Sequence, residues 1–299
     1  MFTKTTFSLA SAMSHPIHFW FEYASPYSML SALRIFHATR KTLPTKLTNG
    51  SPATHIPDIS SVQLVVRPVF LGAVFKMQGQ GFLPNMRVPI KAAYLFHDVS
   101  RTLDQLGFKG FPRTPPKSWP RNTVLAGRMT WMLAQGTEYI QALDRGEAPA
   151  AINAPLAEDV TRVVAEFVWR VYETEFFIED DIAEPAIMAG IWDGCVVGQL
   201  KELGIRVPGG QRAAELAVTE TVKKGFQQNS TLAVQEGVFG APSFTTADHD
   251  MYWGNDRMLD ALNHYNIIPH TKTPDFRSAA AATYKHAAKI AQAKNKANL

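Results

Sequence analysis

The sequence has 299 residues, of which 46% are hydrophobic and 19% charged. A chain of this length can form one large domain, or two closely packed domains, around a sizeable core. Its 30 Lys and Arg residues against 26 Asp and Glu give a net charge of +4. This small, dispersed excess excludes a basic arm for nucleic acid.

The sequence also excludes a membrane-spanning helix and several sulfur-based sites. No segment approaches the roughly 18 consecutive apolar residues that such a helix needs, and residues 1–16 lack the apolar block of a secretory signal. We therefore expect a soluble, intracellular protein. Its single cysteine, Cys195, cannot form an intramolecular disulfide, a Cys-x-x-Cys redox centre, a cysteine-rich zinc site or an iron–sulfur cluster. Any thiol chemistry must use a sulfur from another molecule.

The first predicted unit is a strand, a tight turn and a helix. Residues 1–16 are rich in Thr and Ser, which predicts a flexible leader. The aromatic run of residues 18–23 is typical of a buried strand. Ser25 and Pro26 then signal a helix start, because a serine oxygen can accept from free amides and proline fits the first helical turn. Apolar residues continue behind them at helical spacing.

The next segment alternates between loops and regular structure. Residues 42–61 have no periodicity and are rich in Pro, Ser, Thr, Asn and Gly, so we predict an inserted surface loop. A second strand is expected at 62–68. Residues 72–89 are broken by Gly and Pro and are expected to be irregular, with a helix resuming at Ile90.

From Ile90 to about residue 225 the chain is predicted to be mostly helical. The exception is the segment 107–120, where four prolines predict a rigid loop. Apolar spacing near 3.6 marks the helical segments 121–145, 155–175, 183–193, 195–203 and 211–232.

After Gly237 the pattern returns to strands. The segment 238–244 leads into a strand, residues 248–250 make a turn, and a further strand starts at 251. The segment 254–257 then opens a helix, with a polar pair at its N-cap. An Ala- and Lys-rich tail follows, either helical or without regular structure.

This order predicts an α/β protein with a thioredoxin-like βαβ…ββα arrangement and a large α-helical insertion. The thioredoxin-like domain is expected to comprise residues 17–89 and 233–270, with an inserted helical domain at 90–232. Residues 271–299 form a C-terminal tail, and residues 1–16 the leader.

Within this arrangement, the turn Ser25-Pro26-Tyr27-Ser28 occupies the place where thioredoxin-like enzymes carry Cys-x-x-Cys. Ser25 lies at the positive end of a helix dipole, so it can donate a hydrogen bond to an anion without forming a disulfide. The alternative is that Ser25 only caps the helix. The tripeptide Gly240-Ala241-Pro242 matches the loop where thioredoxin folds hold a cis proline opposite that turn. Proline lacks an amide, which leaves the backbone of the preceding residue free to pair with an extended peptide.

Five ordered segments resemble the kappa-class glutathione transferase and 2-hydroxychromene-2-carboxylate isomerase family, which is itself DsbA-like. They cover both halves of the thioredoxin-like part, whereas the helical block agrees in length and pattern more than in motif. The matching segments are Phe19–Leu30 (FWFEYASPYSML), Val66–Pro68, Val88–Tyr94 with Asp98, Val238–Phe244 and Trp253–Met258.

The resemblance implies glutathione as cofactor and assigns residues to its central part. By position, Ser25 resembles the serine that stabilises the glutathione thiolate. Ala241, before Pro242, resembles the residue whose backbone pairs with the cysteinyl unit.

The two ends of glutathione are assigned in the same way. Lys91 resembles the lysine that meets the glycyl carboxylate, and Gln80 stands where an asparagine usually contacts that end, in a loop two residues longer. Asn255 and Asp256 resemble the pair that holds the γ-glutamyl end. Chemically, a lysine and helix amides suit carboxylates, and an aspartate suits an ammonium. The alternatives are a solvated lysine at Lys91 and an ordinary cap at Asn255.

A glutathione thiolate could attack an electrophile, giving conjugation, or add reversibly to a conjugated alkene beside a carbonyl, giving isomerisation. The second substrate would be a small electrophile or conjugated carbonyl compound, and the resemblance implies a homodimer. We expect no nucleic-acid partner and no membrane partner. We also expect no metal site, because the one candidate, His249, sits in a three-residue turn whose side chains diverge. A serine hydrolase is disfavoured because no GxSxG motif is present. A glutathione-binding or chaperone-like scaffold without catalysis remains the rival.

The sequence offers weak signals for the location of the protein. The C-terminal residues 297–299 loosely resemble a peroxisomal address, and the leader has some features of a mitochondrial transit peptide. We rank the cytoplasm first, the peroxisome second and the mitochondrion third.

Overall fold

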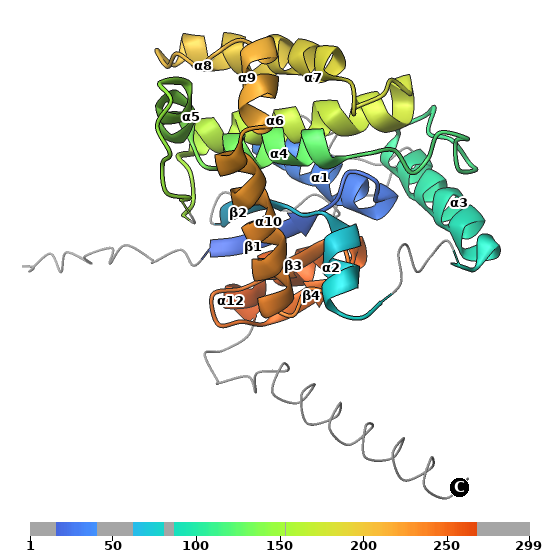
Figure 1. The fold of residues 1–299 in the computed structure, drawn as a ribbon. Helices are drawn as coiled ribbons and strands as arrows, with labels where there is room; N and C mark the ends of the chain where they lie inside the picture. Colours follow the sequence, from blue (N-terminus) through green and yellow to red (C-terminus); the bar gives the residue numbers. More distant parts are fainter. Residues whose placement is uncertain (1–15, 41–61, 81–86, 153, 268–299) are drawn as a thin grey trace, which may run out of the picture.

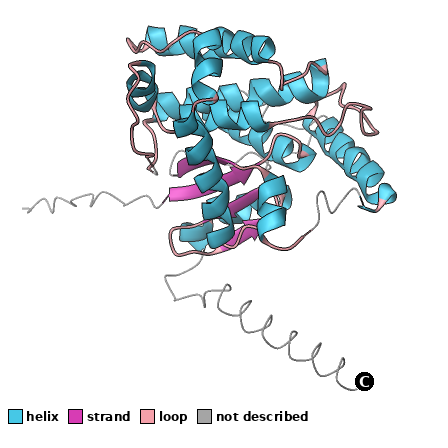
Figure 2. Cartoon of the chain, viewed as in Figure 1, coloured by secondary structure: helices cyan, strands magenta, loops and turns pink. Residues whose placement is uncertain are grey.

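The computed structural model describes residues 16–40, 62–80, 87–152 and 154–267, and the predicted leader (to residue 15), 42–61 loop and C-terminal tail lie outside this part. The described residues form a four-stranded sheet surrounded by helices (Figures 1 and 2). In chain order the elements are β1 (Pro16–Phe21), α1 (Pro26–Arg40), β2 (Gln63–Pro68), α2 (Leu71–Met77), α3 (Pro89–Leu106), α4 (Val124–Ala134), α5 (Thr137–Asp144), α6 (Glu158–Glu173), the π-helical turn η2 (Thr174–Ile178), α7 (Pro185–Trp192), the π-helical turn η3 (Asp193–Val197), α8 (Gly198–Glu202), α9 (Gly210–Ala217), α10 (Glu220–Gln235), β3 (Ser243–Thr245), β4 (Met251–Trp253), the 3-10 turn η4 (Asn255–Arg257), α11 (Met258–Leu262) and α12 (His264–Ile267).

The sheet joins the two ends of the described chain. Its strand order is β2-β1-β3-β4, with β1 parallel to β2 and antiparallel to β3. Phe19 of β1 is paired with Phe244 of β3, and β3 with β4 in an antiparallel hairpin. The sheet thus has the βαβ…ββα order predicted from the sequence, and α3 to α10 lie between β2 and β3 in the chain.

Successive side chains of β1 point to opposite faces of the sheet, as a strand requires. Phe19 and Phe21 belong to the large core that includes α1, α4 and α6. Trp20 belongs to a smaller core on the other face, with Val74 of α2 and Ala233 of α10. Figure 1 shows α10 and α2 passing in front of the sheet. The near-continuous apolar character of β1 therefore follows from burial on both faces.

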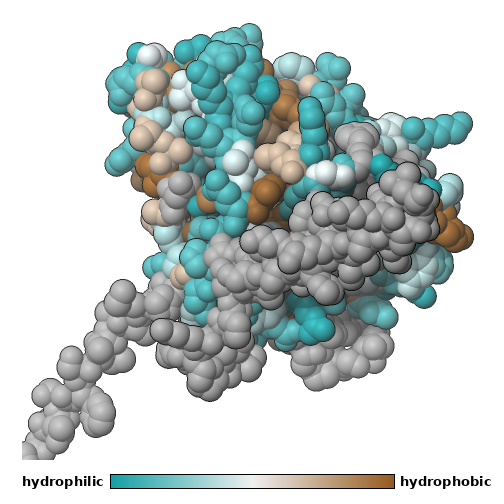
Figure 3. Space-filling view, turned by 60° about the horizontal axis from the view of Figure 1, so that its bottom comes forward, coloured by the Kyte–Doolittle hydropathy of each residue, from teal (hydrophilic) through white to brown (hydrophobic). Residues whose placement is uncertain are grey.

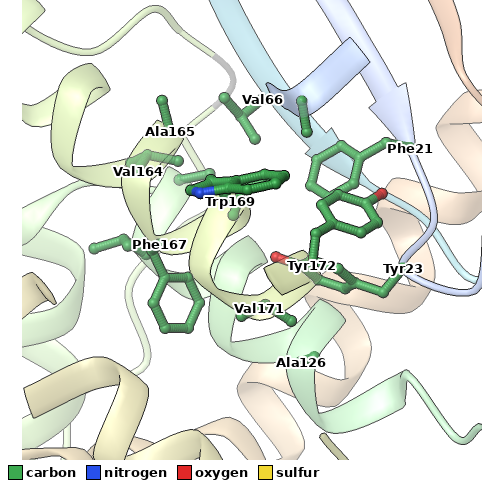
Figure 4. Packing of buried hydrophobic residues seen from close by; sticks show 14 of the residues in the cluster. Phe21, Tyr23, Val66, Ala126, Val164, Ala165, Phe167, Trp169, Val171 and Tyr172 are labelled. Atoms are coloured by element: carbon green, nitrogen blue, oxygen red, sulfur yellow. The ribbon is translucent and has the colours of Figure 1, made fainter. Parts of the chain in front are cut away.

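Aromatic side chains pack where β1 meets α6. The rings of Tyr23 and Tyr172 lie 4.8 Å apart, and Phe21 meets Tyr23 edge to face at 5.4 Å. Figure 4 shows these three rings together, with Trp169 further along α6. The Tyr172 hydroxyl donates to the carbonyl of Glu22 at 2.9 Å. This contact fixes the end of β1, from which the turn into α1 departs.

The expected regular structure is wrong in three segments. The segment expected to be irregular from residue 72 begins with α2, a short helix whose Val74 and Phe75 are buried. The Glu22 carboxylate accepts the first amide of α2, from Leu71, at 2.9 Å, so the residue that directly follows β1 stabilises the helix start. The single helical segments expected at 121–145 and 211–232 are each divided in two, the first at Gly136, whose φ of 93° is left-handed.

In the described segments, no helix is long and apolar enough to cross a membrane. Figure 3 shows one face of the molecule, on which hydrophilic residues cover most of the coloured surface and smaller hydrophobic patches lie among them.

Candidate functional site

Ser25 lies at the start of α1 and makes two hydrogen bonds. Its Oγ accepts the amide of Ser28 at 3.2 Å, which is the N-cap bond predicted from the sequence. The same hydroxyl donates to the carbonyl oxygen of Ala241 at 3.1 Å. Ser25 is partly exposed, and α1 is 15 residues long, so the hydroxyl sits at the positive end of a full-length helix dipole.

The loop opposite Ser25 carries the cis Ala241–Pro242 peptide bond at the position that the sequence indicates. The carbonyl of Pro242 accepts the amide of Gly254 at 2.9 Å, which ties the loop to the end of β4. Gly240 leaves room for the Trp253 indole, because a Cβ on this glycine would lie 2.7 Å from Nε1. The carbonyl of Ala241, expected to be free, is engaged by Ser25.

A pocket of about 330 Å³ lies beside the first turn of α1. The lining residues from α3 are apolar or aromatic except for one cation, Lys91, which is exposed. Pro89 starts α3, where its fixed φ suits the first turn, and this places Lys91 near the mouth. The lining residues are Tyr27, Ile90, Lys91, Tyr94 and Leu95.

One wall of this pocket is held by a hydrogen-bonded cluster between α1 and α3. The Tyr27 hydroxyl donates to Asp98 Oδ2 at 2.9 Å, and Arg101 donates to Asp98 Oδ1 at 2.9 Å and to the Tyr94 hydroxyl at 3.2 Å. Burial, followed by the bond to Asp98, raises the pKa of Tyr27. Because the Tyr27 hydroxyl donates its proton to Asp98, its oxygen can meet a further group mainly as an acceptor. Tyr27, Tyr94 and Asp98 belong to the segments singled out in the sequence, but their contact with one another and with Arg101 was not predicted.

Asn255 lies against α1 rather than at a helix N-cap, which corrects the expectation. Its Oδ1 accepts from Ser31 Oγ at 3.1 Å and from Arg34 Nη1 at 3.1 Å. Its backbone carbonyl also accepts from Arg34 Nη1, at 3.0 Å. The segment forms a 3-10 turn, and the following helix α11 has only five residues and no side-chain cap. The amides of a long helix start are thus not available at this point.

Asp256 and Gln80 are exposed. Asp256 belongs to the turn that Asn255 ties to α1. The side-chain amide of Gln80 donates to Gln78 Oε1 at 3.2 Å. In the part of the chain that the structure describes, no hydrogen bond joins Gln80 to Ser25 or Lys91.

Two contacts that were not predicted from the sequence lie next to the turn between β1 and α1. The Glu22 side chain is 5% exposed, accepts from the Thr123 hydroxyl and caps α2. Burial raises the pKa of this carboxyl. The Trp119 indole donates to the carbonyl of Ala24 at 2.9 Å, which anchors the proline-rich loop to the turn. An acid inside an aromatic strand was the available signal for Glu22.

The three segments predicted to meet do converge on α1. The loop with the cis Ala241–Pro242 bond contacts the start of α1 at Ser25. Helix α3 contacts α1 at Tyr27, and the η4 turn contacts it at Ser31. Among the described residues, no histidine hydrogen-bonds to Ser25; its hydroxyl contacts the Ala241 carbonyl and the Ser28 amide. A hydroxyl donor at a helix start, beside an exposed cation and an apolar pocket, suits the binding of an anionic group of a small peptide-like molecule.

No protein-family model matches this chain. Nor does any curated protein resemble it in sequence.

Solved structures do resemble the chain. The structure of a 2-hydroxychromene-2-carboxylate isomerase matches with a TM-score of 0.55 at 15% identity, covering 92% of this chain and 98% of the isomerase. A probable DsbA oxidoreductase from Streptomyces coelicolor matches with a TM-score of 0.46 at 12% identity, covering 87% of this chain and 93% of its own. At such identities the likeness concerns the fold. The likeness to the isomerase and the strand order of the sheet together show a thioredoxin-like fold, with a large helical insertion between the two parts of the sheet.

Proposed function

We propose that this protein is a glutathione-dependent transferase or isomerase in which Ser25 stabilises the glutathione thiolate. The observation that carries the proposal is the 3.1 Å contact between the Ser25 hydroxyl and the Ala241 carbonyl. It brings a hydroxyl donor, a helix start and the backbone before a cis proline to one point, while the chain's only cysteine is buried elsewhere.

The residues assigned by the resemblance in sequence suit the groups that glutathione presents. Lys91 would meet the glycyl carboxylate, with Gln80 near that end of the tripeptide, and the backbone of Ala241 beside Pro242 would pair with the cysteinyl unit. Asp256 would accept from the γ-glutamyl ammonium. Bound in this way, glutathione would supply a thiol that serves as nucleophile in conjugation or in reversible addition.

The role proposed for Ser25 is to lower the pKa of the glutathione thiol. A free thiol titrates near pH 8.5, and lowering its pKa by about two units requires about 2.7 kcal/mol of preferential stabilisation of the thiolate. The Ser28 amide holds the Ser25 oxygen in place, so the hydroxyl proton can turn from the Ala241 carbonyl toward the sulfur without moving the oxygen. A charge-assisted hydrogen bond and the α1 dipole together can supply an energy of this size.

The second substrate would be a small electrophile or conjugated carbonyl compound. Its place would be the pocket of about 330 Å³ beside Tyr27, which is lined by apolar and aromatic side chains and by Lys91. By the resemblance in sequence we further propose that the protein is a homodimer. For its location we rank the cytoplasm first, the peroxisome second and the mitochondrion third.

The test combines binding with turnover. Calorimetry should detect glutathione binding to the full chain, and ultraviolet absorbance should show a bound thiolate below pH 8. Turnover is then measured with a panel of conjugated enones and aryl halides. Binding with turnover supports the proposal; binding without turnover across the panel identifies a scaffold instead, and absence of binding refutes glutathione dependence altogether.

A further inference from the structure

A buried arginine of the helix that follows Ser25 holds the turn that carries Asp256. Arg34 lies on α1, the helix that Ser25 begins, and only 6% of its surface is exposed. Ser25 and Arg34 are about 13 Å apart along the axis at 1.5 Å per residue. The Arg34 guanidinium does not open to solvent as a ligand-binding cation would. Its Nη1 is instead directed at Asn255.

Asn255 accepts three hydrogen bonds from two side chains of α1. Arg34 Nη1 reaches both its backbone carbonyl, at 3.0 Å, and its side-chain oxygen, at 3.1 Å. Ser31, which is fully buried, donates to the same side-chain oxygen at 3.1 Å. Bonds from a charged donor are among the stronger protein hydrogen bonds, and breaking one in a buried place leaves the partner unsatisfied.

The turn that Asn255 begins has little regular structure to hold it. η4 comprises three residues, and α11 behind it comprises five, without a side-chain cap. Asp256 follows Asn255 directly and is exposed. The location of its carboxylate relative to Ser25 therefore depends on two ties: the bond from the Gly254 amide to the Pro242 carbonyl on one side, and the contact between Asn255 and α1 on the other.

We propose that Arg34, together with Ser31, is a positioning residue for glutathione binding: through Asn255 it sets the Asp256 carboxylate at a fixed place relative to the Ser25 hydroxyl. This inference rests on the proposed function, because it concerns how the γ-glutamyl end of glutathione is held. Arg34 does not touch the ligand. It acts by removing the freedom of the turn before the ligand arrives, which lowers the ordering cost of binding.

A double-mutant cycle tests the proposal with glutathione as the probe. Arg34→Met and Asp256→Asn are each expected to raise the Kd for glutathione about tenfold, measured by calorimetry on the full chain. The double variant is expected to be no more than about twofold weaker than the weaker single variant, because both changes remove the same contact. Arg257→Met is the matched control: it removes an exposed cation of the same turn, paired with Asp260 at 3.0 Å, and should leave the Kd within twofold.

The outcomes separate the inference from the function on which it rests. If wild type does not bind glutathione, the proposed function fails and takes the inference with it. If wild type binds and the two losses multiply to about a hundredfold, Arg34 acts independently of Asp256 and the inference alone is overturned. An unchanged Kd in Arg34→Met overturns it as well. If Arg34→Met does not fold, Ser31→Ala takes its place in the cycle, with an expected loss of about threefold that again does not add to that of Asp256→Asn.

Discussion

The Ser25 hydroxyl donates to the Ala241 carbonyl at 3.1 Å across a sequence separation of 216 residues. One proton and one acceptor are thus paired at the point where the proposed thiolate would lie. A ligand that engages the backbone of Ala241 would compete for this carbonyl and release the hydroxyl toward the sulfur. In the free protein the Ser25 hydroxyl donates to the Ala241 carbonyl; in the proposed complex it would donate to the glutathione sulfur instead.

Removing the Ser25 hydroxyl should separate its capping role from its chemical role. Ser25→Ala is expected to lose about 1 kcal/mol of stability with the cap, whereas Ser25→Gly should lose only a few tenths, since glycine is tolerated at this position. Both variants should bind glutathione within severalfold of wild type, yet show a higher pKa of the bound thiol and a lower kcat. Absorbance titration, turnover and thermal unfolding are the measurements. A wild-type kcat in Ser25→Gly would remove the hydroxyl from the mechanism.

Lys91 should affect binding without affecting the thiolate. Lys91→Met removes an exposed ammonium at the pocket mouth and is expected to weaken glutathione affinity about fivefold to tenfold, equivalent to about 1 kcal/mol. The pKa of the bound thiol should stay as in wild type. Lys76→Met, which removes an exposed lysine of α2, is the control for net charge. Equal losses in the two variants would show a general charge effect rather than a contact at Lys91.

His18 should make stability depend on pH. Burial, followed by the charge of Arg67, lowers the pKa of His18 to about 4, and its Nδ1 accepts from Arg67 Nε at 3.3 Å. In the unfolded chain His18 takes up a proton near pH 6.5, but in the folded chain only near pH 4. The free energy of unfolding should therefore fall by on the order of 3 kcal/mol as pH decreases through this window. His18→Gln keeps an acceptor but does not titrate.

Urea unfolding of wild type and His18→Gln at pH 7, 5.5 and 4 measures this difference. The free energy of unfolding of wild type should fall relative to that of the variant as pH decreases. Glu175, whose pKa burial raises to about 7 despite the opposing charge of Arg121, is present in both proteins and cancels in the comparison. A constant difference across the three pH values would exclude His18 as the source.

Two glycines in helices should respond oppositely to alanine. A Cβ at Gly225 of α10 would lie 2.0 Å from the buried Trp131 ring, so Gly225→Ala should cost about 1–3 kcal/mol through overpacking. Gly190 of α7 is exposed, and a Cβ there meets no atom within 4 Å. Gly190→Ala should therefore stabilise by about 0.5–1 kcal/mol, because alanine is the better helix former. Chemical denaturation of both variants measures the pair; a stabilised Gly225→Ala would contradict the packing described.

Local patterns predicted the parts of the site that depend on short stretches of chain. The strand and cap signals around Ser25 and the Gly-Ala-Pro tripeptide before β3 placed Ser25 opposite Ala241. They did not predict α2, whose first amide is satisfied by Glu22, a residue distant in sequence that directly follows β1. Nor could they predict that Asn255 faces Arg34, since the choice between capping a helix and joining another element is made by tertiary packing. Arg34, a charge among apolar helix positions, was the one visible sign.

The pairing of β1 with β3 has a consequence for biosynthesis. A nascent chain that has emerged only as far as α10 carries Ser25 and Lys91 but neither Ala241 nor Asp256, so the acceptor side of the site is missing. Fragments truncated before residue 241 retain the donor helix and lose the loop that faces it. The site is completed only when the β3–β4 hairpin joins β1, which is synthesised well before it.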